Sequence, residues 1–323
     1  MRRYPKGVPT LLCVLTLLSA GSVFAQDEEA AAPVKPRPAE MMPLASKSLL
    51  LDVTNTGERL VAVGDRGHIL LSANGNDWAQ APVPVRAPLT AVQFVDAQNG
   101  WVVGHDATIL RTQDGGQTWV LQNFEPELEY PFLDVLFLDT ERGFAVGAYG
   151  LMYQTFDGGD SWSEVDAPAI RDEEVHFNSI TRLADGQLFI AGEMGMLGVS
   201  ADQGQTWERL ESPYESSFFG ALPMGNSGAL IYGLRGTVYT ATDVRGEWTE
   251  LQTGTVATMF GGTTLPDGRM ALVGLNGTVI LTDGIRPPQV VKTPTGTPLS
   301  AVISFGDAML AVGESGVQRA AFQ

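Results

Sequence analysis

The sequence predicts an all-β fold, a seven-bladed β-propeller of four-stranded antiparallel blades. A unit of two short apolar runs, a glycine turn between them and a closing polar turn is clearest in residues 100–119 and returns along the chain. Its first glycine recurs every 39 to 45 residues, at Gly64, Gly104, Gly147, Gly192, Gly233, Gly274 and Gly313. Repeats of this length, with several short strands each and no sustained helical periodicity, are typical of propeller blades.

The N-terminal segment resembles a secretory signal peptide, which we expect to comprise residues 1–25. It has a basic start, an apolar run too short to cross a bilayer, and a cleavage-like sequence, Val23-Phe24-Ala25. The only cysteine, Cys13, lies within it and not at the cleavage site, so neither a lipid anchor nor a disulfide is expected.

The chain is strongly acidic, with a formal net charge of −17. Removal of residues 1–25 would take away three positive charges, Arg2, Arg3 and Lys6, and move the charge to −20. Such a chain repels nucleic acid and anionic lipid, and suits a basic partner surface or a cation. High acidity is equally consistent with keeping an exported protein in solution.

Residues 26–38 are rich in Ala, Pro and charge and predict a disordered linker, which leaves 39–323 for the propeller. The seventh repeat ends at Gln323, before a fourth strand can form. Because ring closure removes exposed strand edges, we expect residues 40–45 to supply that missing outer strand. Prolines at 36, 38 and 43 restrict this segment to an edge role.

Each blade is expected to begin with an inner strand, followed outward by three more. The inner strands are predicted at 48–53, 89–95, 132–138, 178–183, 220–224, 258–262 and 300–305. In the second blade the four strands fall at about 90–95, 101–103, 108–111 and 119–123.

The polar turn has the form S/T-x-D-x-G-x-T/S-W, known as the Asp-box or bacterial neuraminidase repeat. It is intact at 112–119, 155–162 and 200–207. The aspartate is suited to accept backbone N–H groups, the glycine permits a positive φ, and the tryptophan can pack between blades. We therefore interpret the following residues as structural, not as catalytic carboxylates: Asp114, Trp119, Asp157, Trp162, Asp202 and Trp207.

The repeated V-G-x-x-G turn between the second and third strands leaves its two middle residues free to vary. Strand alternation places these turns on one face, together with long acidic and aromatic connections between blades. This face is the candidate partner-binding site, and its residues are Asp65, Arg66, His105, Asp106, Glu125, Glu127, Glu129, Tyr130, Tyr149, Asp172, Glu173, Glu174, Glu193, Tyr214 and Arg235. The alternative is that the acids are only solvated and the aromatic residues are tucked between blades.

The repeats, most clearly WVVGHDATILRTQDGGQTW and FAVGAYGLMYQTFDGGDSW, resemble the photosystem II stability and assembly factor family of seven-bladed propellers. The resemblance covers about residues 46–323 and implies a non-enzymatic factor that binds an assembly intermediate of a membrane protein. The family is associated with an arginine-rich binding patch, whereas this chain is acidic. The signal peptide is more similar to that of a periplasmic relative in a bacterium that does not photosynthesise.

A sialidase-like glycoside hydrolase or carbohydrate-binding propeller is the alternative, because the Asp-box also occurs in those proteins. Such an enzyme needs three arginines, a Tyr–Glu pair and an aspartic acid, together with an Arg-Ile-Pro element that this sequence lacks. Arg66, Arg235 and Tyr149 lie in suitable turns but in different blades. The three histidines, His68, His105 and His176, lack the spacing of metal ligands.

We therefore expect an exported, non-enzymatic interaction scaffold or assembly factor for a membrane-associated or envelope protein complex. It would be periplasmic, or lumenal in the thylakoid of a photosynthetic host. No cofactor, metal, nucleic acid or membrane insertion is expected, and a closed propeller needs no second chain, which predicts a monomer. A solute- or cation-binding propeller is a third possibility.

Overall fold

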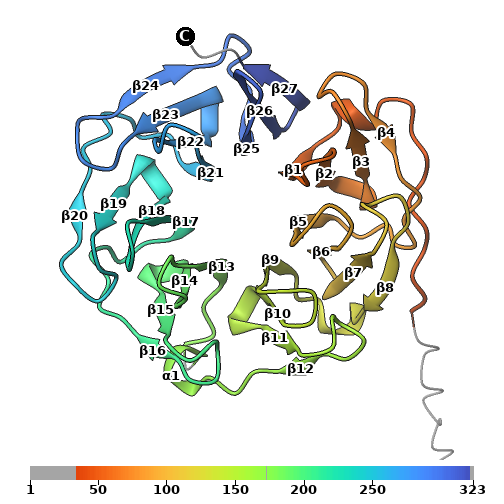
Figure 1. Ribbon diagram of the computed structural model, residues 1–323, viewed down its shortest axis with the longest axis horizontal. Coiled ribbons are helices and arrows are strands. Elements are labelled where there is room, and N and C mark those ends of the chain that lie inside the picture. Colours follow the sequence, from red (N-terminus) through yellow and green to blue (C-terminus); the bar gives the residue numbers. More distant parts are fainter. Residues whose placement is uncertain (1–33, 172, 321–323) are drawn as a thin grey trace, which may run out of the picture. The chain divides into compact units, whose positions relative to one another are not determined.

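The computed structural model describes residues 34–171 and 173–320, with the side chain of residue 320 left out. These residues form seven antiparallel sheets whose strands follow one another in chain order. The sheets stand as blades in a ring, with the first strand of each blade innermost (Figure 1), and residues of these inner strands line a central channel. The predicted all-β, seven-bladed propeller is confirmed. The predicted signal peptide, and most of the predicted linker, lie outside the described residues.

Six blades have four strands each. Blade 1 consists of β1 (Leu50–Asn55), β2 (Leu60–Gly64), β3 (Ile69–Ser72) and β4 (Ala79–Gln80). Blade 2 consists of β5 (Leu89–Phe94), β6 (Gly100–Gly104), β7 (Thr108–Thr112) and β8 (Val120–Asn123). Blade 3 consists of β9 (Phe132–Phe137), β10 (Gly143–Gly147), β11 (Met152–Thr155) and β12 (Ser163–Glu164). Blade 4 consists of β13 (Phe177–Arg182), β14 (Leu188–Gly192), β15 (Leu197–Ser200) and β16 (Glu208–Arg209).

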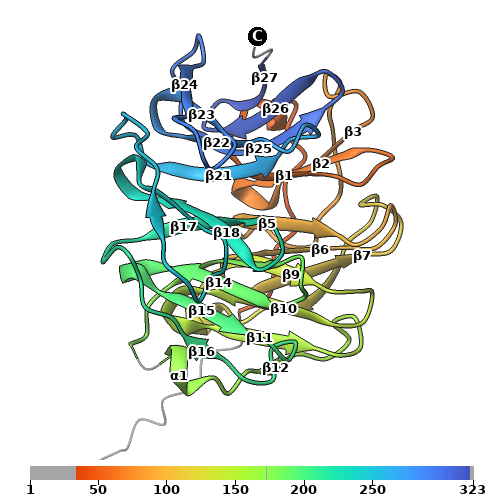
Figure 2. The ribbon, with the colours of Figure 1, turned by 60° about the vertical axis from the view of Figure 1, so that its left-hand side comes forward.

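The remaining blades continue the ring, as Figure 2 shows from another side. Blade 5 consists of β17 (Phe218–Met224), β18 (Gly228–Gly233), β19 (Val238–Ala241) and β20 (Thr249–Glu250). Blade 6 consists of β21 (Met259–Thr264), β22 (Met270–Gly274), β23 (Thr278–Thr282) and β24 (Gln289–Lys292). Blade 7 consists of β25 (Leu299–Phe305), β26 (Ala308–Gly313) and β27 (Gly316–Ala320).

Helical structure in the described residues is limited to single turns. The one α-helical turn is α1 (Pro168–Arg171). The 3₁₀ turns are η1 (Ala45–Lys47), η2 (Asp65–Gly67), η3 (Pro126–Leu128), η4 (Ala148–Gly150), η5 (Glu193–Gly195), η6 (Leu234–Gly236) and η7 (Leu275–Gly277).

In blades 1 to 6 the second strand is buried on both faces because neighbouring blades cover it. Every residue of β6, Gly-Trp-Val-Val-Gly, is buried, and β2, β10, β14, β18 and β22 share this pattern. A strand covered on both sides needs a continuous apolar run instead of alternation. This explains why the apolar part of the repeat is its most regular feature.

The core consists of seven hydrophobic clusters, one between each pair of neighbouring blades among the described residues. Between blades 2 and 3, Trp101 is fully buried and stacks on Phe137 with ring planes 8° apart. The tryptophans of the Asp-boxes join the same kind of cluster, since Trp119 packs between blades 1 and 2 and Trp207 between blades 3 and 4. The interleaved blades therefore stabilise the ring by apolar burial.

The predicted outer strand at 40–45 is wrong. In the described part of the chain, blade 7 has three strands, and residues 40–44 form none. This segment lies instead beside β4 of blade 1, where the Ala39 N–H donates to Val83 O at 3.0 Å and Gln80 bonds the backbone of Glu40 and Met42. Ring closure rests on the cluster in which Leu50 and Leu60 of blade 1 pack against blade 7.

Candidate functional site

The turns between the second and third strands follow one backbone plan. The residue that follows the first glycine donates its N–H to the carbonyl oxygen of the residue just before the inner strand of the same blade. Asp65 donates to Leu49 O at 3.0 Å, and Glu193 donates to His176 O at 2.9 Å. The residue after that takes a left-handed conformation with φ between +51° and +58° in five turns, at Arg66, Tyr149, Met194, Arg235 and Asn276. This conformation points a side chain away from the blade, and all five residues are exposed.

These turns share one face with the connections between blades. The second glycine of a turn lies directly against such a connection. A Cβ on Gly67 would meet Val85 O at 2.2 Å, and one on Gly195 would meet Tyr214 O at 2.2 Å. In blade 2 the glycine is replaced by Ala107, which adopts φ +46° and donates its N–H to Tyr130 O. We call this surface the turn face.

An aromatic and acidic cluster lies on the turn face where blades 3 and 4 meet. The ring of Tyr149 lies 4.7 Å from that of Tyr130 and 4.7 Å from the imidazole of His176. The Tyr149 N–H donates to His176 Nδ1 at 3.0 Å, and the His176 N–H donates to the Glu193 carboxylate at 3.3 Å. The structure thus brings together three of the predicted residues, Tyr130, Tyr149 and Glu193.

His176 of this cluster, and Met194 next to it in the chain, were not among the predicted site residues. His176 stands just before β13 and orders the backbone of the Tyr149 turn. Met194 follows Glu193 in the left-handed position and is 63 % exposed, while Tyr149 in the equivalent position is 49 % exposed. Alignment of the repeats identifies Met194 as a candidate, because Met194 occupies the variable position that Tyr149 occupies one blade earlier.

Several predicted acids have partners within the chain. Glu125 accepts hydrogen bonds from Asn123 at 2.9 Å and from the Tyr153 hydroxyl at 3.2 Å. Glu173 pairs with Arg209 at 2.8 Å. The charge of Glu173 is therefore partly neutralised, and the carboxylate of Glu125 is held by bonds within the chain, so both are less available to a partner than the sequence indicates.

The other predicted residues are spread around the ring. Asp65 and Arg66 pair with each other at 3.4 Å in blade 1. Tyr214 is half-buried and packs near Phe218. The remaining residues are exposed except for the half-buried Asp106, and they do not join the Tyr149 cluster: His105, Asp106, Glu127, Glu129, Glu174 and Arg235. Asp172 lies outside the described residues.

The channel holds a cavity of about 230 Å³ at the end nearest the turn face. The inner strands begin at this end, because Leu50, the first residue of β1, pairs with Gly64, the last residue before the turn of blade 1. The lining includes Asp52, Asp134 and Tyr232 and contains no arginine. The three converging arginines that a sialidase needs are therefore not found in this cavity.

The two channel aspartates are held by backbone amides. Asp52 accepts the N–H groups of Val53 at 2.8 Å and of Val92 in the next blade at 2.9 Å. Asp134 repeats the arrangement with Val135 at 2.8 Å and Ile180 at 2.8 Å. Burial outweighs these hydrogen bonds and raises the pKa of Asp52 to about 7 and that of Asp134 to about 6.

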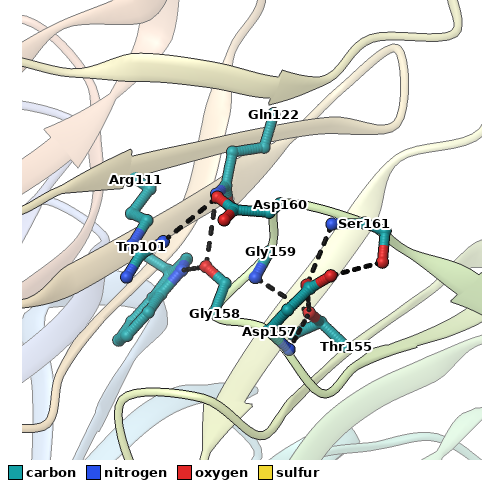
Figure 3. A network of polar contacts seen from close by, with 9 residues as sticks. All are labelled: Trp101, Arg111, Gln122, Thr155, Asp157, Gly158, Gly159, Asp160 and Ser161. Carbon is teal, nitrogen blue, oxygen red and sulfur yellow. Dashed lines mark hydrogen bonds and ion pairs between the residues drawn. The ribbon is translucent and has the colours of Figure 1, made fainter.

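The Asp-boxes lie at the opposite end of the strands, and Figure 3 shows the box of blade 3. Asp157 accepts the Ser161 hydroxyl at 2.6 Å and the Ser161 N–H at 2.9 Å, and it also accepts the Thr155 hydroxyl at 2.8 Å. These hydrogen bonds lower the pKa of Asp157 to about 2. Asp114 and Asp202 make the same set of bonds in their own turns. All their strong contacts are local, which accords with a structural role.

A second network joins this turn to blade 2. The carbonyl oxygen of Gly158 accepts the Trp101 indole N–H at 3.0 Å and the Gln122 amide at 3.2 Å, while Arg111 pairs with Asp160 at 3.4 Å (Figure 3). The guanidinium of Arg111 also lies over the Trp101 ring, 5.6 Å from its centroid. These contacts fix one blade to the next and add no reactive arrangement.

Metal ligation and membrane spanning find no support in the described residues. No group of three or more His, Cys, Asp or Glu side chains there is placed to hold a metal ion. Likewise, none of the helices in residues 34–171 and 173–320 has the length and apolar character needed to cross a bilayer.

Comparison with known proteins finds similarity to photosystem II assembly factors. The sequence model described as "Photosynthesis system II assembly factor YCF48" matches residues 70–130 and 121–282. The photosystem II assembly protein Ycf48 of Thermosynechococcus vestitus is 43% identical over 44 residues, which cover 14% of this chain and 13% of that protein. The chloroplastic photosystem II stability/assembly factor HCF136 of Guillardia theta is 39% identical over 67 residues, covering 19% of this chain and 17% of that protein. The matched segments thus span less than a fifth of either relative.

Solved structures extend the likeness to the whole propeller. A YCF48 solved bound to D1 peptide superposes with a TM-score of 0.68 and 18% identity, covering 89% of this chain and 97% of that one. YCF48 from Cyanidioschyzon merolae gives a TM-score of 0.66 and 18% identity, covering 86% and 96%. The WD40 propeller of Doa1 gives an equal TM-score of 0.68 at 12% identity, covering 88% and 95%. At these identities the superpositions establish the fold alone.

Proposed function

Because this chain belongs to the family of the photosynthesis system II assembly factor YCF48, we propose that it is a non-enzymatic assembly or stability factor that binds a protein of a membrane-associated complex. The matching relatives are named as assembly factors. A related propeller has been solved with a bound peptide, which supports recognition of an unfolded or extended segment of a partner. Export from the cytoplasm, to the periplasm or a thylakoid lumen, is part of the proposal.

The observation that carries the proposal is the exposed side chains at left-handed positions of the turn face. Tyr149 and Met194 occupy equivalent positions in adjacent blades and are both exposed, although they are large apolar residues. Their backbones are fixed by the same hydrogen-bond plan, so little backbone conformational entropy is lost when a partner covers them. Aromatic residues and methionine on a rigid support are typical of protein-binding surfaces.

The test is co-purification of the full-length chain, tagged at its C-terminus, with detergent-solubilised membranes of its own host. The face variant carries Tyr149→Ser and Met194→Ser. The control carries Phe156→Ser and Val120→Ser, which replace exposed apolar residues at the Asp-box end. We expect a membrane-protein complex to be retained by the parent chain and the control, and to be reduced roughly tenfold or more by the face variant. Equal capture by all three chains, or no capture by the parent, would contradict the proposal.

A further inference from the structure

The mouth of the channel cavity is lined by four large apolar side chains and by three smaller polar ones, Thr90, Asn178 and Ser300. Each inner strand has a bulge at its start, and the bulged residue lies at the mouth. In four blades that residue is large and apolar, namely Leu51, Leu133, Phe219 and Phe260, all of which line the cavity. The rings of Phe219 and Phe260 lie 5.5 Å apart. An occupant that enters from the turn face therefore passes these four apolar side chains, which we call the collar.

Beyond the collar the cavity is acidic. Asp52 and Asp134 follow Leu51 and Leu133 directly, and both line the cavity. Each carboxylate is fixed by two backbone N–H groups, one from its own strand and one from the next blade. No Lys, Arg or His is among the lining residues, so no side-chain cation there balances these two acids.

Tyr232 contributes a polar group without a partner. Its side chain is 5 % exposed and lines the cavity. A Cβ on Gly220 would lie 2.1 Å from the hydroxyl oxygen, so glycine at that position makes room for the phenol. Among the described residues, none forms a hydrogen bond with this hydroxyl. A hydroxyl in this position is available to hydrogen-bond a ligand or a water in the cavity.

We propose that this cavity receives one basic side chain, a lysine or arginine, from the segment of the partner that docks on the turn face. The collar matches the aliphatic stem of such a side chain, and the two carboxylates and the Tyr232 hydroxyl match its cationic head. A bare metal ion would use the acids but not the apolar collar. The inference rests on the proposed function, because it assumes a protein partner on the turn face.

Occupancy by a cation should depend on pH. Asp52, Asp134 and Tyr232 are the titratable groups that line the cavity. Burial raises the pKa of both aspartates, and burial also raises the pKa of Tyr232 so that its hydroxyl stays protonated near neutral pH. Protons therefore compete with the incoming cation, and binding strengthens as the pH rises through about 6 and 7.

The test uses the full propeller with n-butylammonium as the probe for a lysine side chain, and n-butanol and Ca²⁺ as comparisons. The N–H groups of Val92 and Ile180 bond directly to the two carboxylates, so their amide NMR signals report on the cavity. We expect saturable shifts of both signals with n-butylammonium, stronger at pH 8 than at pH 5, and none with n-butanol. Asp52→Asn should weaken binding about tenfold.

Two further variants make the outcome decisive. Tyr232→Phe keeps the ring and its packing, and should weaken n-butylammonium binding about threefold. Asp283→Asn, which is outside the cavity lining and the candidate partner-binding site, should leave it unchanged. Absence of shifts with n-butylammonium, or tighter binding of Ca²⁺ than of n-butylammonium, would overturn the inference. If the cavity binds n-butylammonium but no membrane complex co-purifies, it is the proposed function that fails; if the complex co-purifies without cation binding, only this inference fails.

Discussion

The two channel aspartates show how one position in the repeat determines the charge and the proton binding of the channel. Asp52 and Asp134 occupy the same place in blades 1 and 3, and each connects its blade to the next by accepting an amide N–H. A buried carboxylate favours its neutral form, even with two amide donors. At a pH between the ordinary and the raised pKa, these two carboxyl groups therefore keep their protons in the folded protein, whereas in the unfolded chain they have lost them.

This difference gives a pH dependence of defined sign. Both folded pKa values lie above the ordinary 3.8, so the stabilising contribution is complete below pH 3.8 and is lost as the pH rises through about 6 and about 7. Between pH 5 and 7 we expect Asp52 to make the free energy of unfolding fall by at most about 1.4 kcal/mol per pH unit. Urea unfolding at several pH values should show a shallower fall in Asp52→Asn.

The matched control is Asp283→Asn. Hydrogen bonds from the backbone N–H groups of Arg286 and Ile285 lower the pKa of Asp283 to about 2, so it does not titrate in this range. Its variant should keep the parent slope. Parallel curves for the parent and Asp52→Asn would contradict the assignment.

Trp101 offers a second test at the scale of single residues. Its side chain is fully buried, stacks on Phe137 and donates its indole N–H to Gly158 O at 3.0 Å. Trp101→Phe should lower the free energy of unfolding by about 2–3 kcal/mol, because it leaves a cavity and removes the hydrogen bond. Chemical denaturation measures the change.

Trp162 provides the comparison, since it contacts the same Phe137 but its buried indole N–H has no partner in the described structure. Trp162→Phe should cost less than about 1 kcal/mol, because it removes an unsatisfied donor. Equal costs for the two substitutions would contradict this account of Trp101.

At the scale of strands, the sequence predicts the inner strands to within about two residues of their observed starts, because the repeat aligns them. The one outer strand given bounds, at about 119–123, agrees with β8 to within one residue, whereas no bounds were predicted for the two-residue outer strands β4, β12, β16 and β20. The predicted position of segment 40–45, at the edge of blade 7, is wrong. The segment is held at blade 1 by tertiary contacts, and such contacts leave no periodic pattern in the sequence. Gln80, whose side chain fixes that segment, is not distinctive in the sequence.

This placement can be tested through Gln80. Its amide accepts the Met42 N–H at 2.8 Å and donates to Glu40 O at 2.9 Å. Gln80→Ala should release the segment at a cost of about 0.5–1.5 kcal/mol, and limited proteolysis should then cleave within residues 39–44 several times faster. Lys292→Ala, at the outer strand of blade 6, is the control. An unchanged cleavage rate in Gln80→Ala would mean that the segment is held elsewhere.

For the whole molecule, the repeat was sufficient to predict the ring and the shared turn face, because period and glycine turns are local features. The site was predicted only in part. Tyr130, Tyr149 and Glu193 do meet, whereas Glu125 and Glu173 have partners within the chain that no spacing could reveal. The channel acids were missed because they resemble ordinary strand residues until seven inner strands surround one cavity.

The central claim is that partners dock on the turn face. It is tested most directly by a photo-crosslinking amino acid placed at 194, on the turn face, or at 156, at the Asp-box end, in the full-length chain within its host. Both positions carry side chains that are 63 % exposed, so they are matched in accessibility. The account predicts a specific crosslink to a membrane-complex protein from position 194 and none from 156. Crosslinks from 156 alone, or equally from both positions, would contradict it.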